Sequence, residues 1–316
     1  MNKVFNILVT GCGGDIGQSI GKILLKSKYT KNLFGIDISN KNASQFIYPN
    51  FSISVPVTDP DYLQRLELFI EKHEIDLIIP IAEPELRFFS EQNILKVIGK
   101  AKMITASALA LKIGFNKFKT AEFLKREKLP FPKTFIVKSL KRIDDFPVIL
   151  KSNTGSGSKN IHKISSIEEF LFYTKNTVDD YVVQEFISDE MGEFTCGVFR
   201  SSSKEIRTQI FKRELTSGYS GYGEVIENTN ISNLLENIAV KLDLVGSINV
   251  QLRLKENQPI VFEINPRFSS TVLFRHLLGF QDLIWSIEDL LGYTLSDNRS
   301  NIVGKKFYKG FEEYIK

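Results

Sequence analysis

The stretch that most constrains the fold of this 316-residue chain is residues 246–267, with the sequence GSINVQLRLKENQPIVFEINPR. Residues 247–254 alternate small or polar side chains with apolar ones, and residues 259–264 are apolar and partly β-branched. The polar residues 255–258 separate the two runs. Two strand-like runs joined by a short polar connection predict an antiparallel β-hairpin.

Polar side chains are expected to gather on one face of this hairpin. Alternate side chains of a strand share a face, so Gln251 on the first strand can meet Glu263 and Asn265 on the second. Arg267 follows two residues further on. Hard cations such as Mg²⁺ take oxygen ligands and share them with substrate phosphates, and Arg binds phosphate or carboxylate through two parallel hydrogen bonds.

The alternative for the same hairpin is a surface ribbon whose polar face is merely solvated. Val261, Phe262 and Ile264 argue against it, because their apolar run predicts a buried strand. A buried Glu263 needs an ion-pair partner or a metal ion. Composition therefore favours the cation site over the solvated ribbon.

The two motifs of the hairpin, G-S-x-N-V-Q and F-E-x-N-P-R, resemble the metal-binding core of ATP-grasp enzymes. The variant to which they are most similar is the large subunit of carbamoyl-phosphate synthase, which also uses Gln, Glu and Asn where many relatives use acidic residues. The resemblance implies ATP with Mg²⁺, or Mn²⁺, held by Gln251, Glu263 and Asn265. It also implies that Arg267 is catalytic and stabilises negative charge as the reaction proceeds.

Composition limits the class of protein. With 42% hydrophobic and 25% charged residues, the chain is typical of globular proteins, and its length suits two or three lobes. A net charge of +4 suits a small anionic ligand and does not indicate nucleic acid. Two cysteines predict no disulfide framework and a reducing cytoplasm. No apolar run reaches membrane-spanning length, and a glycine motif by Gly11 leaves no room for a signal peptide.

Residues 1–105 alternate strand-like and helix-like segments. Strands are predicted at residues 5–10, 33–38, 76–80 and 101–105, and helices at residues 18–25, 60–73 and 83–97. This alternation predicts an α/β lobe with a parallel, doubly wound sheet. The lobe resembles the Rossmann-like pre-ATP-grasp domain, which binds no dinucleotide and often contributes to the acceptor pocket.

A dehydrogenase is the alternative for this lobe. Gly11, Gly14 and Gly17 after a strand, with Asp37 after the next, resemble the dinucleotide fingerprint of extended short-chain dehydrogenases. That family needs a Tyr-x-x-x-Lys pair, and none of the ten Tyr residues has Lys four positions later. A lone glycine loop also suits a tight turn that lets a helix pack on the sheet. An NAD(P)-dependent oxidoreductase is therefore disfavoured.

Two acids, Glu83 and Glu85, directly follow the third predicted strand. Folds of this kind bind ligands at the carboxyl edge of the sheet, so either acid is a candidate to contact a substrate amine. The alternative is a solvated helix start, where the helix dipole stabilises negative charge.

Residues 106–190 resemble the linker helix and lid of the ATP-grasp fold. Lys117 opens a predicted helix at residues 118–127, and Pro130 ends it. A predicted strand ends in Lys151 and precedes a Ser- and Gly-rich loop, whose backbone N–H groups suit phosphates. A flexible polar hairpin is the alternative. The resemblance implies that ATP contacts Lys117, the catalytic Lys151, and the loop residues Ser156, Gly157 and Ser158.

A further predicted strand, residues 180–187, resembles the hinge between lid and body. The resemblance implies that Glu185, Phe186 and Ile187 border adenine and that Glu193 contacts ribose. Gln184 lies beside this hinge, and its role is left open.

Residues 191–316 are expected to form the body. Antiparallel strands are predicted at residues 193–200 and 205–213, a mobile glycine–aromatic loop at residues 216–223, and helices at residues 231–242 and 271–278. Candidate substrate contacts are Arg213 or its neighbour Lys212, Gly218 and Ser269, and Arg275 is either a surface or a site residue.

The predicted fold is therefore α/β, with α+β character in the ATP-grasp part. Its domains are a Rossmann-like domain (1–105), a lid (106–190) and a body with the metal site (191–316). The single ATP-grasp unit is expected to be a carboxylate–amine, or carboxylate–thiol, ligase that forms an acyl phosphate and releases ADP. Its partners are small-molecule substrates, not nucleic acid or membrane, and a homodimer is left open. The alternative is a non-catalytic ATP-binding or sensing protein. The sequence does not identify the substrates.

Overall fold

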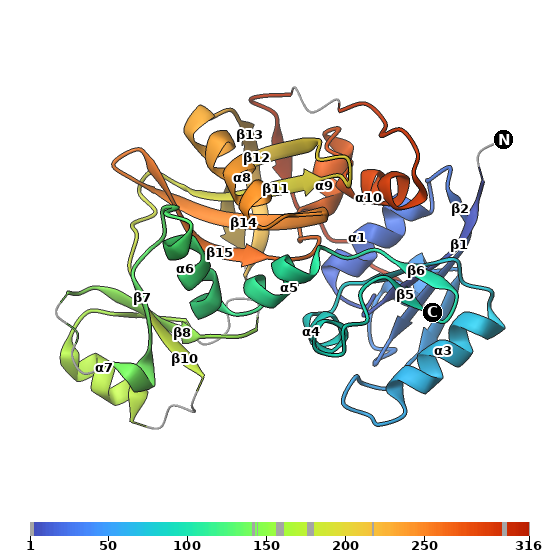
Figure 1. The fold of residues 1–316 in the computed structure, drawn as a ribbon, viewed down its shortest axis with the longest axis horizontal. Coiled ribbons are helices and arrows are strands. Elements are labelled where there is room, and N and C mark those ends of the chain that lie inside the picture. Colours follow the sequence, from blue (N-terminus) through green and yellow to red (C-terminus); the bar gives the residue numbers. More distant parts are fainter. Residues whose placement is uncertain are drawn as a thin grey trace.

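The structure is a computed structural model of the chain. It describes residues 3–140, 143, 145–155, 161–175, 180–216, 218–298 and 302–315. The strands of these residues form three sheets, one in each of an N-terminal lobe, a lid and a body (Figure 1). The predicted fold class, an α/β lobe followed by two antiparallel lobes, is confirmed.

The N-terminal lobe is a mostly parallel sheet in the order β3-β2-β1-β4-β6-β5. Its elements are β1 (Phe5–Thr10), α1 (Asp15–Leu24), β2 (Thr30–Asp37), α2 (Ser44–Ile47), β3 (Asn50–Ile53), α3 (Tyr62–Lys72), β4 (Leu77–Pro80), α4 (Glu83–Glu91), β5 (Val97–Ile98) and β6 (Ala101–Met103). Ile7 and Leu8 point to opposite faces of β1, and both are fully buried. A sheet covered on both faces explains the unbroken apolar run of β1.

The predicted helix at residues 83–97 is too long. Helix α4 ends at Glu91, and residues 97–98 pair with β6 as an antiparallel strand. Asn93 has a φ of 57°, and the N–H of Ile94 donates to the carbonyl of Phe89 (2.8 Å). This left-handed cap ends a helix without Gly or Pro, so the apolar residues beyond it resembled a continued helix.

The lid is a four-stranded sheet in the order β7-β10-β8-β9, and all of its pairings are antiparallel. Its strands are β7 (Thr134–Ile136), β8 (Val148–Ser152), β9 (His162–Ile164) and β10 (Tyr181–Glu185), accompanied by the 3₁₀ turn η1 (Val137–Ser139) and helix α7 (Ile167–Thr174). Helices α5 (Ala108–Gly114) and α6 (Lys117–Arg126) connect the N-terminal lobe to the lid. The strand that ends near Lys151 is found as β8.

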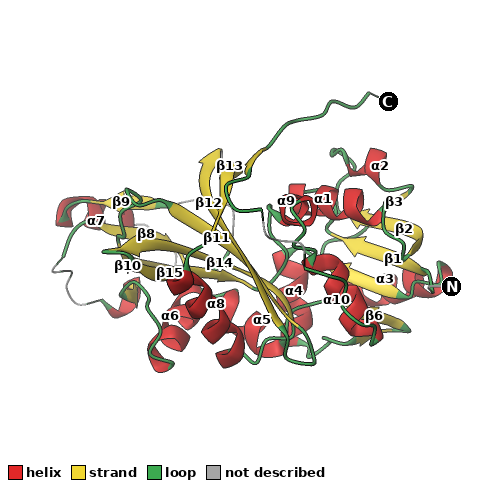
Figure 2. Ribbon diagram, turned by 90° about the horizontal axis from the view of Figure 1, so that it is seen from above, coloured by secondary structure: helices red, strands yellow, loops and turns green. Residues whose placement is uncertain are grey.

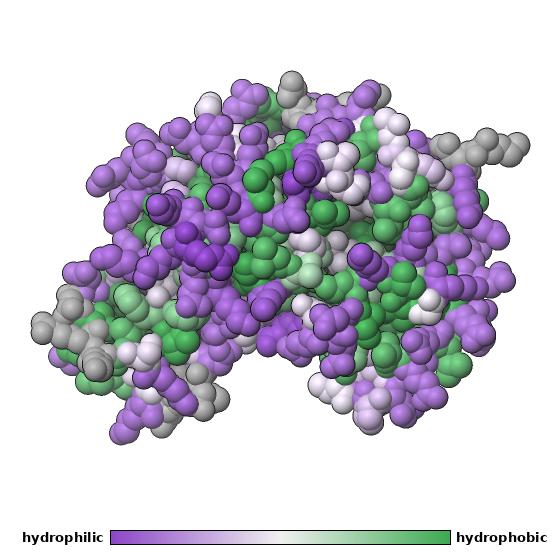
Figure 3. Space-filling view, viewed as in Figure 1, coloured by the Kyte–Doolittle hydropathy of each residue, from purple (hydrophilic) through white to green (hydrophobic). Residues whose placement is uncertain are grey.

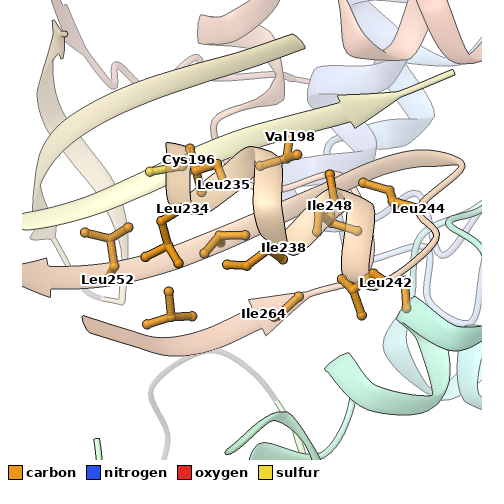
Figure 4. Packing of buried hydrophobic residues seen from close by; sticks show 14 of the residues in the cluster. Cys196, Val198, Leu234, Leu235, Ile238, Leu242, Leu244, Ile248, Leu252 and Ile264 are labelled. Atoms are coloured by element: carbon orange, nitrogen blue, oxygen red, sulfur yellow. The ribbon is translucent and has the colours of Figure 1, made fainter. Parts of the chain in front are cut away.

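The body is a six-stranded antiparallel sheet in the order β15-β14-β11-β12-β13-β16. Its strands are β11 (Glu193–Arg200), β12 (Ile206–Thr216), β13 (Tyr219–Ile226), β14 (Gly246–Lys255), β15 (Gln258–Asn265) and β16 (Lys306–Tyr308). Helix α8 (Thr229–Lys241) lies across one face and packs Leu235 and Ile238 against Val198, Ile248 and Leu252 (Figure 4). Because α8 covers this face, polar side chains of the same strands gather on the opposite face.

The prediction of a mobile glycine–aromatic loop at residues 216–223 is wrong. Residues 219–223 belong to β13, which pairs with β12 on one side and β16 on the other. A Cβ on Gly223 would lie 2.4 Å from the ring of Phe307 on β16. Gly223 therefore permits the two strands to pack closely. In the sequence alone, a glycine that is required for strand packing cannot be distinguished from a glycine in a loop.

A β-bulge interrupts the β14–β15 hairpin. Gln251 lies opposite Glu263 and Leu252 lies opposite Val261, so Phe262 is the extra residue. Val261 and Ile264 are both buried against α8 although they are three positions apart, which a regular strand does not allow. Phe262 is half-buried and faces away from α8, so the prediction of a buried strand at residues 261, 262 and 264 is wrong for this residue.

The end of the chain completes the N-terminal lobe. Helices α9 (Val272–Leu277) and α10 (Asp282–Leu291) lie beside α1 (Figure 1), and Val272, Leu283 and Ile287 share a core with Ile7 and Ile20. The predicted domain bounds at residues 105 and 190 fall between β6 and α5 and between β10 and β11. The core of the N-terminal lobe is thus closed by residues far from it in sequence.

The last described residues tie the body to the N-terminal lobe. After β16, Lys309 forms an ion pair with Asp15 at the start of α1 (2.8 Å), and Glu312 pairs with Lys22 (2.8 Å). Figure 2 shows this segment crossing from the body sheet toward α1 and α2. In the described part of the chain, no helix combines the length and apolar character needed to cross a bilayer.

Candidate active site

A cavity of about 760 Å³ lies where the lid, the body and the N-terminal lobe meet. Its volume is in the range of small-molecule sites. The space-filling surface is hollowed between the lid, at lower left, and the N-terminal lobe, at lower right (Figure 3). The cavity is lined by predicted site residues of the linker, lid and body, namely Lys117, Lys151, Glu185, Ile187, Glu193, Arg213, Gly218, Gln251, Glu263, Asn265, Arg267 and Ser269.

The three predicted metal ligands occupy neighbouring places on the hairpin. Gln251 lies opposite Glu263, and Asn265 lies opposite Asn249, all facing the cavity. No ion pair from another described residue reaches Glu263. The described residues contain no cluster of three or more His, Cys, Asp or Glu that would hold a metal on its own. One carboxylate and two amide oxygens suit Mg²⁺ that arrives with nucleotide phosphates.

Glu193 lies between two arginines that its strand neighbours supply. It pairs with Arg213 on β12 and with Arg253 on β14. One carboxylate oxygen accepts from Arg213 (2.8 Å), and the other accepts from Arg253 (2.7 Å). All three side chains are largely buried, so charge-assisted hydrogen bonds fix them. The predicted ribose contact of Glu193 remains a prediction.

Arg213 is directed at protein groups rather than at open space. Besides Glu193, its guanidinium donates to Ser220 (3.1 Å) and to the side-chain oxygen of Gln251 (2.8 Å). Its neighbour Lys212 is exposed and does not belong to the residues that line the cavity. Arg213 therefore orients Gln251, a function that its sequence position alone does not suggest.

The two predicted phosphate-binding lysines approach the cavity from different elements. Lys117 is the first residue of α6, which Asn116 caps, and its ammonium donates to the carbonyl of Gly155 (2.8 Å). Lys151 is buried, with 5% of its surface exposed, and donates to the side-chain oxygen of Gln184 (2.7 Å). Burial lowers the pKa of Lys151 to about 8. The predicted loop contacts Ser156, Gly157 and Ser158 lie outside the described residues.

Of the three predicted hinge residues, two line the cavity and the one between them does not. Glu185 and Ile187 line the cavity, and the carbonyl of Ile187 accepts from Arg253 (2.7 Å). Phe186 is not among the lining residues, and its ring centroid lies 4.0 Å from the ammonium of Lys163. Successive side chains of an extended segment point to opposite sides, which explains why the side chain of Phe186 does not line the cavity. Its predicted place beside adenine remains a prediction.

Arg267 lies where the body meets the N-terminal lobe. Its guanidinium donates to the carbonyl of Phe268 (3.0 Å). Burial lowers the pKa of Arg267, and the carboxylates of Glu83, Glu263 and Asp15 act in the opposite direction. Glu83 does not line the cavity, but its carboxylate accepts from the N–H of Gly155 in the lid (3.0 Å). This hydrogen bond links two lobes, and the predicted substrate contact of Glu83 remains a prediction.

The predicted substrate contact of Glu85 is wrong. This side chain is 8% exposed, and its two oxygens accept from Thr10 (2.8 Å) and Tyr62 (2.5 Å) inside the N-terminal lobe. Burial raises the pKa of Glu85. Asp37, the candidate ribose acid of a dehydrogenase, accepts from the N–H of Gly13 (2.7 Å) and so occupies the glycine turn itself. Both carboxylates thus accept hydrogen bonds from groups of the N-terminal lobe itself.

Sequence reasoning missed several residues that line the cavity. Asn249 and Arg253 lie two residues before and after Gln251 on β14 and line the cavity with it. The same alternation that identified Gln251 could therefore have identified both of them. Asp15 and Tyr219 line the end nearest the N-terminal lobe, together with Gly218 and Ser269. No local signal placed Asp15 there. Arg275 is fully buried and pairs with Asp282 (3.3 Å), so it is neither a surface residue nor a lining residue.

A model of the ATP-grasp domain matches residues 115–271. The large chain of carbamoyl-phosphate synthase from Caldanaerobacter subterraneus subsp. tengcongensis is 23% identical over 221 residues, which cover 64% of this chain and 21% of that protein. The chain thus spans about a fifth of the length of the curated relatives it matches. The predicted resemblance to this branch is confirmed.

Solved structures share the fold at low sequence identity. The ADP complex of purK, an N5-carboxyaminoimidazole ribonucleotide synthetase, matches with a TM-score of 0.75 and 15% identity, covering 97% of this chain and 81% of that one. An L-amino acid ligase from Bacillus licheniformis matches with a TM-score of 0.67 and 17% identity, covering 92% and 75%. A biotin carboxylase domain from Hydrogenobacter thermophilus, in complex with MgADP and bicarbonate, matches with a TM-score of 0.73 and 14% identity, covering 96% and 74%.

Proposed function

Because this chain is an ATP-grasp domain protein with distant homology to the large chain of carbamoyl-phosphate synthase, we propose that it is an ATP-dependent ligase. It activates a carboxylate as an acyl phosphate and joins it to an amine, or to a thiol, with release of ADP and phosphate. One observation carries the proposal: two lysines, three oxygen donors and Arg267 face a single cavity from three separate parts of the chain.

ATP lies between the lid and the body in this proposal. Ile149, Ile187 and Phe262 give one part of the cavity an apolar lining suited to adenine. Lys117 and Lys151 hold the phosphates from the lid side, where fixed positive charge compensates their negative charge. Gln251, Glu263 and Asn265 hold Mg²⁺, which neutralises phosphate charge when it is bound. Arg213 keeps the side-chain oxygen of Gln251 oriented.

The chemistry is phosphoryl transfer followed by acyl transfer. A carboxylate oxygen of the substrate attacks the γ-phosphorus, and the bond from phosphorus to the ADP oxygen breaks. The amine then attacks the carbonyl carbon of the acyl phosphate, phosphate leaves with the bonding electrons, and the amine loses a proton. Arg267 lies beside the metal ligand Glu263 and stabilises the oxygen charge that develops in both steps.

Several matched proteins support a ligase over a mere nucleotide-binding protein. Their names include a synthetase, an amino acid ligase and a carboxylase domain with bound bicarbonate. The test is an ADP-release screen with mixtures of amino acids, sugar acids, amines and thiols. The proposal expects ADP that depends on a carboxylate together with an amine or a thiol, and ADP release with no acceptor dependence would contradict it.

The metal assignment predicts a selective loss in Glu263→Gln. Removing the one carboxylate of the donor set is expected to weaken MgADP binding on the order of tenfold, because ligand charge sets cation affinity. ADP binding in the presence of EDTA is expected to stay unchanged. Calorimetry with and without Mg²⁺ checks both results, and Glu256→Gln at the exposed hairpin turn is the control. Equal MgADP affinity in Glu263→Gln and wild type would remove the assignment.

A further inference from the structure

We infer that Thr134 and Gln184 are positioning residues that hold the side chain of Lys151 as an ammonium directed at the phosphates. The inference deepens the proposed function and rests on it only for the phosphate-binding role of Lys151. Both residues lie on lid strands, Thr134 on β7 and Gln184 on β10.

A chain of buried hydrogen bonds connects these residues. Lys151 donates to the side-chain oxygen of Gln184 (2.7 Å), and the side-chain nitrogen of Gln184 donates to the hydroxyl oxygen of Thr134 (2.9 Å). The hydroxyl of Thr134 in turn donates to the carbonyl of Pro132 (2.8 Å). The exposed fractions of Lys151, Gln184 and Thr134 are 5%, 4% and 8%. Water therefore contributes little to satisfying these groups.

The backbone carbonyl at the end of the chain fixes the direction of every bond. A carbonyl only accepts, so the single hydroxyl hydrogen of Thr134 is used on Pro132. The oxygen of Thr134 can then only accept, which requires that the NH₂ group of Gln184 faces it. The amide oxygen of Gln184 consequently faces Lys151. The amide orientation thus follows from the network and not from the amide alone.

Sheet register places the three side chains on one face. Gln184 lies directly opposite Thr134 on one side and opposite Ile149 on the other. Lys151 lies two residues beyond Ile149, so it shares the face of Gln184 and meets it diagonally. Ile149, Lys151 and Gln184 all line the cavity. These hydrogen bonds from Lys151 through Gln184 and Thr134 to Pro132, called the relay below, therefore connect the backbone at the start of the lid to the part of the cavity proposed to hold the phosphates.

The orientation of the Gln184 amide matters because Lys151 lies close to the boundary between its ammonium and neutral forms. Burial favours the neutral amine and lowers the pKa of Lys151 to about 8. The charged groups that face it from other elements are Glu263 and Glu193, which favour the ammonium, and Lys117 and Arg253, which oppose it. The amide oxygen of Gln184, at hydrogen-bond distance, also favours the ammonium form of Lys151. A reversed amide would direct its N–H groups at the ammonium and favour the neutral amine.

The first test titrates Lys151 in the nucleotide-free protein by NMR of ¹³C-labelled lysine. Gln184→Leu is expected to reduce the proton affinity of Lys151 about tenfold or more, the size of one hydrogen bond to a charged group. Thr134→Val removes the bond that orients the amide of Gln184 and is expected to reduce the proton affinity of Lys151 in the same direction. Thr134→Ser keeps the hydroxyl and is expected to restore the wild-type titration. Thr174→Val is the control, since it removes another lid hydroxyl, bonded to Phe170, outside the relay. A wild-type titration in both Thr134→Val and Gln184→Leu would overturn the inference.

The second test measures MgADP and adenosine binding by calorimetry at pH 7 and pH 9. Thr134→Val is expected to weaken MgADP binding more strongly at pH 9 relative to wild type, and to leave adenosine binding unchanged. An equal loss at both pH values, or an equal loss for adenosine, would show a packing effect and overturn the inference. If wild-type protein binds no MgADP, the proposed function fails, and the titration of the nucleotide-free protein still decides the relay.

Discussion

Arg267→Ala is expected to slow ADP release by roughly 10²–10³-fold, the typical cost of losing one preorganised donor to a developing oxyanion. Arg267 and Glu263 line the same cavity, and the burial of Arg267 lowers its pKa. Because low-dielectric surroundings strengthen electrostatic interactions, little of this stabilisation would be replaced by solvent. The measurement is the turnover rate with the acceptor mixture identified by the ADP-release screen.

Comparing the turnover rate with the MgADP affinity distinguishes a catalytic role of Arg267 from a role in nucleotide binding. Arg267→Ala should leave MgADP affinity within a few-fold of wild type, because in the proposed site the phosphates are held by the two lysines and by Mg²⁺ rather than by Arg267. Arg65→Ala, which removes an exposed arginine on α3, is the control for loss of a positive charge. Wild-type ADP formation by Arg267→Ala would show that the assigned role is wrong.

Lys151→Met is expected to stabilise the nucleotide-free protein while abolishing MgADP binding. Lys151 ionises with an ordinary pKa of 10.5 in the unfolded chain and with a pKa of about 8 in the fold. That difference corresponds to at most about 3 kcal/mol of native-state cost. Methionine has a similar length and no charge to bury, so the fold regains much of this free energy. Function thus opposes stability at this position.

The free energy of unfolding of the wild-type protein is expected to depend on pH through Lys151. Below about pH 8 the folded protein carries the buried ammonium and bears the full cost. Between that pH and 10.5 the unfolded chain binds the proton that the folded protein has lost, so native stability rises with pH. The stability gain of Lys151→Met over wild type is therefore largest at pH 7 and shrinks toward pH 10. Urea denaturation of both proteins at the two pH values measures it, and a less stable variant at pH 7 would contradict the account.

The hairpin shows how far local pattern can predict a site. Period-2 alternation placed Gln251, Glu263 and Asn265 on one face, which the register confirms. The same pattern could not predict the bulge at Phe262, because a bulge adds a residue without changing composition. A strand without the bulge would place Val261 on the face of Glu263. The prediction that these three side chains share a face succeeded because they lie on the side of the bulge that keeps regular alternation.

Long-range partners explain the failures. Glu85 was predicted to meet substrate because it follows a strand, yet its partners are Thr10 and Tyr62, 75 and 23 residues away. Arg213 was predicted as a candidate substrate contact and does line the cavity, but only the pairing of β11 with both β12 and β14 reveals that it also binds Glu193 and Gln251. Pairings between distant strands are not encoded in local spacing. The relay from Lys151 to Thr134 belongs to the same class of information.

The most direct test of the proposed ligase follows the carboxylate oxygen. Protein is incubated with ATP, Mg²⁺, amines and a mixture of amino acids and sugar acids whose carboxylates carry ¹⁸O, and the released phosphate is analysed by mass spectrometry. If the carboxylate attacks the γ-phosphorus, one ¹⁸O atom is transferred to inorganic phosphate as the acyl phosphate is consumed. Phosphate without ¹⁸O, or release of AMP and pyrophosphate in place of ADP, would contradict the acyl-phosphate mechanism.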